Sequence, residues 1–121
     1  MSQALALRPF VPAKDFELSK RFYQAIGFTI GHQDGDVAGM KLDGQGFILQ
    51  NFYRTELAEN FMLQLMVRDV DSWWQRIDGE KLTADFGVKP PRAPEFQPWG
   101  LKVGFLFDPS GVLWHVAETP F

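Results

Sequence analysis

The residues best suited to ligand chemistry lie in the last quarter of the chain. Trp99 stands in the segment Gln97-Pro98-Trp99-Gly100, and His115 stands in an apolar, strand-like segment close to the C-terminus. Between them, Asp108-Pro109-Ser110-Gly111 is typical of a type I turn, because Pro presets φ and Gly suits the fourth corner. The sequence therefore predicts a hairpin that presents His115, preceded by a loop that carries an aromatic ring. An indole face can stack on a planar ligand, and an imidazole can donate or accept a hydrogen bond.

The chain does not contain the residues that several other kinds of functional site require. The chain has no cysteine, which excludes disulfides and thiolate metal sites, and it has no Gly-x-Ser-x-Gly or phosphate-binding loop. The net charge of −3 and the absence of a basic stripe argue against a nucleic-acid partner. Met1–Leu7 has no basic leader region, and no apolar run approaches the length of a membrane span. We expect a cytoplasmic protein with no membrane partner.

Composition predicts one ordinary globular domain. The chain has 121 residues, 45% of them hydrophobic and 22% charged, which is enough to bury a core. Aromatic residues reach 15%, with 12 Phe and 4 Trp. Most of these rings must be core, and a ring-lined pocket or subunit interface would account for the excess.

The elements that position these residues repeat along the chain. Alternating apolar residues predict a first strand over Leu5–Val11, with Pro9 favouring an edge. Asp15 can cap a helix that runs to about Ala25, with Gly27 just beyond its end. Asp34-Gly35-Asp36 and Asp43-Gly44-Gln45-Gly46 then predict turns between three strands. These strands are expected at Phe28–Gln33, Val37–Leu42 and Phe47–Phe52.

The second half follows the same order after a polar connection over Tyr53–Asn60. We expect a strand, then a helix that starts at Asp69 or Asp71 and ends at Gly79, then a short strand, a proline-rich loop and the closing hairpin. The expected strands are Phe61–Val67, Thr83–Val88, Leu101–Phe107 and Val112–Ala117, with the loop at Lys89–Pro98. This predicts an α+β fold of two β-α-β-β-β modules, about residues 4–53 and 60–118, with mixed sheets that form a concave cleft. A single α+β sandwich without internal symmetry is the alternative.

The motifs resemble those of the glyoxalase/bleomycin-resistance/dioxygenase superfamily, also called vicinal oxygen chelate proteins. The resemblance rests on Ala13-Lys14-Asp15, on Val67-Arg68 before an acidic helix start, and on the Trp99 loop with the hairpin that ends in His115-Val116-Ala117-Glu118. It is greatest with the bleomycin-resistance branch, and it implies the two-module fold and a homodimer with ligand clefts at the interface.

Enzymes of this superfamily hold a divalent metal on four strands, and the corresponding positions fall near Arg8, Gln50, Met62 and His115. Arg8 has no lone pair to give, and Met62 is a soft thioether that does not suit hard divalent ions. Gln50 and His115 alone fall short of the three protein donors that such a site needs. We therefore expect no metal, no cofactor and no catalytic residue.

The resemblance implies a metal-free binder that sequesters a planar or amphipathic drug or metabolite, with Trp99 stacking on it. Polar contacts are expected from His115, Arg8, Gln50 and Gln64, and further lining from Phe47, His32 and Val37. Additional aromatic residues of the branch are missing here, so the resemblance does not extend to bleomycin itself as the ligand; the positions concerned are His32, Val37, Gln64 and Met66. Two alternatives stay open: a divergent metal-dependent enzyme that uses His115, Gln50 and a donor such as Glu118 or a partner-chain residue, and a structural dimer module without a ligand.

Overall fold

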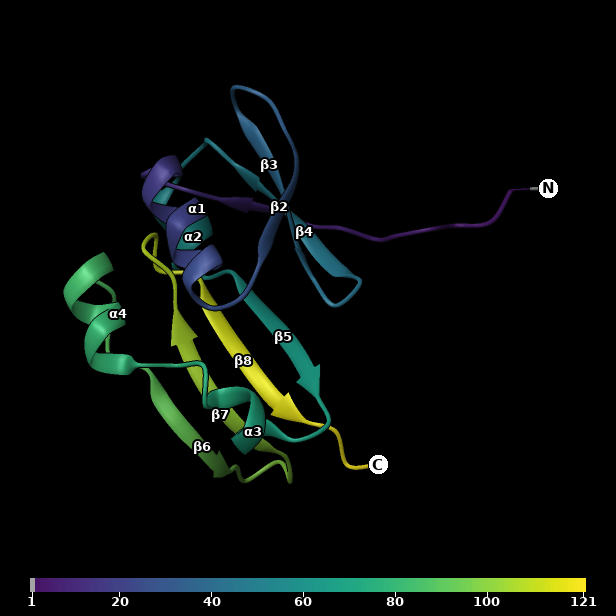
Figure 1. Ribbon diagram of the computed structural model, residues 1–121, viewed down its shortest axis with the longest axis vertical. Helices are drawn as coiled ribbons and strands as arrows, with labels where there is room; N and C mark the ends of the chain where they lie inside the picture. Colours follow the sequence, from purple (N-terminus) through teal and green to yellow (C-terminus); the bar gives the residue numbers. More distant parts are fainter. Residues whose placement is uncertain (1) are drawn as a thin grey trace.

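Two four-stranded sheets make up the computed structural model, which describes residues 2–121 (Figure 1). In each sheet the first strand pairs in parallel with the last, and the remaining pairs are antiparallel. The first module has the strand order β1-β4-β3-β2 and the second β5-β8-β7-β6. The elements of the first module are β1 (Phe10–Pro12), α1 (Phe16–Ala25), β2 (Thr29–Gln33), β3 (Val37–Leu42) and β4 (Gln45–Gln50). After α2 (Thr55–Ala58) in the connection come β5 (Met62–Val67), α3 (Val70–Trp74), α4 (Gly79–Phe86), β6 (Arg92–Phe96), β7 (Lys102–Phe107) and β8 (Leu113–Glu118).

The predicted α+β fold of two β-α-β-β-β modules is confirmed, but the first strand is shorter than predicted. Only Phe10–Pro12 pairs with β4, and residues 2–9 form an extended arm that leaves the body of the protein (Figure 1). Leu5 and Leu7 are 95% and 96% exposed on this arm. The strand predicted over Leu5–Val11 is therefore wrong for residues 5–9, because the alternating pattern does not supply a strand for this segment to pair with.

Three predictions in the second module were wrong. The segment predicted as a strand at Thr83–Val88 lies mainly in α4, and Gly79 begins this helix rather than ending the previous one. The Asp78 side chain caps α4 by accepting a hydrogen bond from the Lys81 amide, and Gly87 ends it in the left-handed region. The proline-rich loop contains the strand β6, which tolerates Pro94 because it lies at the sheet edge and has an irregular register between Arg92 and Glu95.

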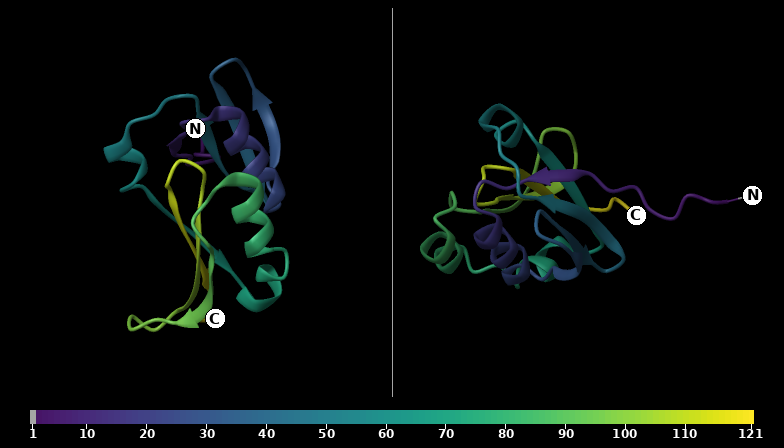
Figure 2. Two further views of the ribbon diagram at one scale, coloured as in Figure 1. Left: turned by 90° about the vertical axis from the view of Figure 1, so that its left-hand side faces the viewer. Right: turned by 90° about the horizontal axis from the view of Figure 1, so that it is seen from above.

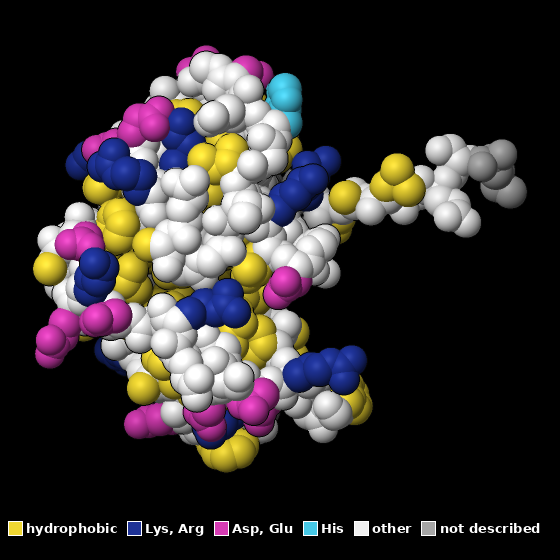
Figure 3. Space-filling view, in the orientation of Figure 1, with side chains coloured by type: hydrophobic (Ala, Val, Ile, Leu, Met, Phe, Trp, Pro, Cys, Tyr) yellow, Lys and Arg dark blue, Asp and Glu magenta, His cyan; other side chains and the backbone are white. Residues whose placement is uncertain are grey.

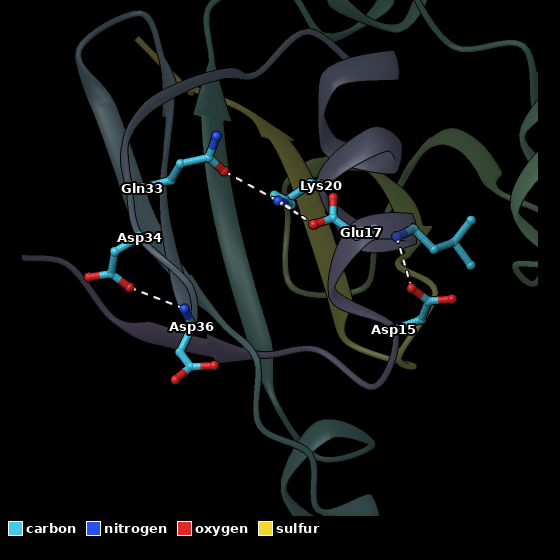
Figure 4. A network of polar contacts seen from close by, with 7 residues as sticks. Asp15, Glu17, Lys20, Gln33, Asp34 and Asp36 are labelled. Carbon is cyan, nitrogen blue, oxygen red and sulfur yellow. Dashed lines mark hydrogen bonds and ion pairs between the residues drawn. The ribbon is translucent and has the colours of Figure 1, made fainter.

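Helix α1 packs on the sheet of the first module and α3 on the sheet of the second, and α4 lies beside α1 (Figure 2). Asp15 caps α1 as predicted. Lys20 joins this helix to β2 by donating a hydrogen bond to Gln33, and it also forms an ion pair with Glu17 on α1 itself (Figure 4). Phe22 of α1 and Phe86 of α4 pack edge to face at 5.6 Å, which joins the helical layers of the two modules. Within residues 2–121, none of these helices is long and apolar enough to cross a membrane.

A buried polar chain joins the two modules inside the core. The Tyr23 hydroxyl, from α1, donates a 2.6 Å hydrogen bond to Asp108 Oδ2, from the β7–β8 turn. Trp114 Nε1 in turn donates to the Tyr23 oxygen at 2.9 Å, and Asp108 Oδ1 accepts from the amides of Ser110 and Val112. All three linked side chains are at most 5% exposed. The predicted Asp-Pro-Ser-Gly turn therefore also anchors the first module to the second.

Trp74 packs against the sheet at Gly104, and this contact yields a testable prediction. A Cβ atom at Gly104 would lie 2.5 Å from Trp74 Cζ3, and two more ring atoms lie within 3.0 Å. Because the indole ring is rigid and held on α3, we expect Gly104→Ala to lower the free energy of unfolding by about 1–3 kcal/mol. Urea denaturation measures the change. The matched control is Gly35→Ala, where nothing lies within 4 Å, and an equal loss in both variants would contradict the packing argument.

Candidate functional site

Each sheet has a second face that the helices do not cover, here called the open face. On β4, Phe47 and Leu49 point into the core, so Gly46, Ile48 and Gln50 lie on the open face. On β8, Trp114 and Val116 are core, which places Leu113 and His115 on the open face of the second module. Residues directly paired across neighbouring strands share a face, so the register extends both surfaces.

The open face of the second module carries an aromatic platform formed by Trp99, Phe105 and His115. Phe105 is paired with His115 in the β7–β8 ladder, and their rings meet edge to face at 4.9 Å. Trp99 lies in the β6–β7 turn, which Gly100 closes with a φ of +99°, and its ring centroid is 6.3 Å from that of His115. Trp99 is 57% exposed, so most of the ring is available for contact. A half-buried imidazole between two rings can hold a planar ligand and offer it a hydrogen bond.

The open face of the first module is more polar. Gln50 and Val37 are directly paired there, and His32 is exposed on β2 next to Gly39. Lys41 is paired with Gly46 on this face, and its stem lies over Gly31, where a Cβ would be 3.3 Å from Lys41 Cε. The two glycines thus leave room for this lysine to lie along the sheet.

A groove of about 850 Å³ runs where the two modules meet. One side is the arm from Leu5 to Pro9 and the start of β4, the other is Leu63–Met66 of β5, and the core rings of Phe28, Phe47 and Trp114 reach its floor. Figure 3 shows hydrophobic side chains gathered across the middle of one face, between the halves of the molecule, and along the arm. Because Gln64 is paired with His115, the groove leads onto the aromatic platform.

The eight residues predicted from the sequence fall into three groups. Trp99 and His115 share the platform, while Arg8, Phe47 and Gln64 line the groove. Three other residues lie on or beside the open face of the first module and do not line the groove: Gln50, Val37 and His32. Phe47 is only 2% exposed, and its ring centroid lies 4.8 Å from that of Tyr23, so Phe47 is mainly a core residue that also reaches the floor of the groove. One chain therefore does not bring all eight residues into one site.

The positions that the resemblance assigned to a metal do not fit one. Arg8 is a cation on the arm, Met62 is a thioether that is 63% exposed, and Gln50 and His115 belong to different sheets. Glu118, the candidate replacement donor, turns to the helix side and accepts a 3.1 Å hydrogen bond from the Val70 amide. Within residues 2–121, no three His, Asp or Glu side chains gather closely enough to hold a metal ion.

Sequence reasoning missed two residues of this region. Phe105 completes the platform. The predicted β7–β8 hairpin could have identified it, because the turn determines which residue is paired with His115. Lys41 lines the groove, and no local signal marks it, because its position depends on where β3 lies relative to β5.

Comparisons with known proteins agree with this fold. The family model described as Glyoxalase/Bleomycin resistance protein/Dioxygenase superfamily matches residues 6–116. A bleomycin resistance protein from Klebsiella pneumoniae is 28% identical over 116 residues, which cover 92% of this chain and 90% of that protein. A bleomycin-binding protein solved with bleomycin has a TM-score of 0.77 at 23% identity, covering 98% of this chain and 99% of that one. Another, from Streptomyces verticillus and solved with copper(II)-bleomycin, has a TM-score of 0.78 at 20% identity, with coverage of 98% and 99%.

Proposed function

We propose that this chain, which belongs to the Glyoxalase/Bleomycin resistance protein/Dioxygenase superfamily, sequesters a planar or amphipathic small molecule without changing any of its bonds. The observation that carries the proposal is the exposed aromatic platform of Trp99, Phe105 and His115 at the end of a large groove. Apolar lining with a few polar groups is typical of small-molecule sites. The relatives named as bleomycin-binding proteins support this activity class.

We further propose that the binding protein is a homodimer. Large apolar side chains are exposed on the arm and on the open face of the second module, among them Leu7 at 96% and Met62 at 63%. A second copy could cover these surfaces and complete a cleft over the platform. Light scattering over a range of concentrations tests this, and a mass equal to one 13.8 kDa chain throughout would contradict it. A cytoplasmic location and the absence of nucleic-acid partners stay predictions from the composition.

The test of sequestration is a titration of purified protein followed by tryptophan fluorescence. We choose bleomycin and the neutral fluorophore phenylnaphthylamine as probes, because one matches the relatives and the other is a simple planar molecule. Saturable binding and recovery of the unchanged probe by mass spectrometry support sequestration. Elemental analysis of the same sample addresses the enzyme alternative, since about one transition-metal ion per chain together with turnover of a probe would favour catalysis.

The Trp99 ring is expected to contribute directly to binding. Trp99→Ala should weaken phenylnaphthylamine binding by about fivefold to tenfold, because stacking contributes about 0.5–1.5 kcal/mol beyond the burial of area. Trp99→Phe keeps an aromatic face and should recover part of the affinity. The matched control is Phe96→Ala, which removes a ring of the neighbouring edge strand that is 75% exposed, more than Trp99. Binding by Trp99→Ala as tight as that of the parent protein would remove Trp99 from the site.

A further inference from the structure

The charged side chains that line the groove are all positive. Sixteen residues line the groove, and the two charged ones among them, Arg8 and Lys41, are both cations. The whole chain has a net charge of −3, whereas the charged side chains that line this groove are positive. Within residues 2–121, no carboxylate forms an ion pair with either cation, since the ion pairs there join Lys20, Lys81 and Lys102 to other acids.

The packing of the Lys41 stem fixes the course of this side chain at the edge of the groove. Lys41 lies on the open face of β3, and its Cγ and Cε rest beside the bare backbone of Gly46 and Gly31. A side chain at either glycine would compete for this space, and at Gly46 it would also meet the Met40 carbonyl oxygen at 2.7 Å. The aliphatic part of the Lys41 side chain therefore packs along the sheet, and no carboxylate among the described residues forms an ion pair with its ammonium group.

The aromatic platform shows no comparable excess of charge. At its far edge β6 carries Arg92, paired with Phe105, and Glu95, paired with Val103, so one cation and one anion offset each other. From the groove to Phe105 the path crosses β5, β8 and β7, which is about 10 Å at ordinary strand spacing. A ligand that reaches both regions would place rings on the platform and a second group near Arg8 and Lys41.

We infer that the groove selects an anionic ligand: a planar aromatic molecule bearing a carboxylate, sulfonate or phosphate that lies between Arg8 and Lys41. This inference rests on the proposed function, because it names the chemical class that the same site takes. A positively charged molecule of the same size would meet two like charges and no acid in the groove, and is disfavoured.

The experiment compares two fluorophores that differ by one charged group. Anilinonaphthalene sulfonate is phenylnaphthylamine with a sulfonate added, so the ratio of their affinities reports on charge rather than on the rings. At low salt we expect the sulfonate to bind about tenfold more tightly, with the preference shrinking as salt screens the cations. Arg8→Gln and Lys41→Gln should each reduce sulfonate affinity about threefold to fivefold and should change the affinity of the neutral amine by a smaller factor, so that the ratio of the two affinities falls.

The control cation is Arg21, which is exposed on α1 on the covered side of the first module. Arg21→Gln changes the net charge equally, so it should leave the affinity ratio as in the parent protein. Equal binding of the two fluorophores, or an equal effect of all three variants, would overturn the anion inference while leaving the binding function standing. Tighter binding of acridine orange, a planar cation, would overturn it as well. Failure of every probe to bind would overturn both the inference and the proposed function.

Discussion

Tyr23→Phe is expected to lower the free energy of unfolding by about 3 kcal/mol at neutral pH. The substitution keeps the ring, so the edge-to-face contacts with Phe47, Phe28 and Trp114 remain. It removes the hydroxyl that donates to Asp108 and accepts from Trp114. Asp108 Oδ2 and Trp114 Nε1 then lose their hydrogen-bond partner inside the core, while Asp108 Oδ1 keeps the Ser110 and Val112 amides, and each such loss costs about 1–3 kcal/mol. Because the lost contact joins α1 to the β7–β8 turn, the modules themselves are loosened.

Thermal and urea denaturation measure this effect. For a chain of this size, about 3 kcal/mol corresponds to a fall in melting temperature of about 10 °C. The other tyrosine of the chain provides the control, since Tyr53 is half-buried and no hydrogen bond of its hydroxyl is present among the described residues. Tyr53→Phe should change the stability by less than about 0.5 kcal/mol. Similar losses for both variants would show that the ring environment matters and the Tyr23–Asp108 hydrogen bond does not.

Much of the fold was predictable because its signals are local. The Asp15 cap, the glycine at position 27 with its φ of +114°, and the Asp34-Gly35-Asp36 turn each determine the structure within a few residues. These features position α1 and the β2–β3 hairpin almost where the sequence placed them. The same holds for the hairpin that presents His115.

The errors arose where two local patterns competed or where a partner strand decided the outcome. Thr83–Val88 is short, and its β-branched ends suggested a strand, but the cap at Asp78 and the left-handed Gly87 favour a helix. Pro94 argued against a strand, and only the sheet edge makes β6 possible. A strand was predicted over Leu5–Val11, but only Phe10 and Val11 of this segment pair with β4.

The candidate site was predicted only in part, because it is built from long-range contacts. Trp99 and His115 were identified from the hairpin and from the resemblance, and both lie on the platform. How the two sheets are placed decides that Lys41 and Gln64 line the same groove and that Gln50 and His115 lie on different sheets, and no local pattern in the sequence encodes this placement. Tyr23 and Asp108 are 85 residues apart, and nothing near Asp108 distinguishes it from an ordinary turn aspartate.

The burial of Asp108 is expected to make the stability of the protein depend on pH. Burial raises the pKa of Asp108 from 3.8 to about 6, although hydrogen bonds from Tyr23 and from backbone amides hold it lower than burial alone would. The folded protein therefore binds this proton more tightly than the unfolded chain does. The resulting stabilisation is fully present below pH 3.8 and is lost as the pH rises through about 6. The two pKa values correspond to a change of about 3 kcal/mol over this window.

The measurement is the free energy of unfolding of the parent protein and of Asp108→Asn between about pH 4 and pH 7. The asparagine cannot ionise, and its oxygen can still accept hydrogen bonds from the Ser110 and Val112 amides. All other carboxylates titrate in both proteins, so the difference between the two curves isolates Asp108. The parent should lose up to about 3 kcal/mol relative to the variant as the pH rises, with most of the change between pH 4 and 6. A constant difference, or a parent that gains stability with pH relative to Asp108→Asn, would mean that the hydrogen bonds to the carboxylate outweigh the cost of burying its charge.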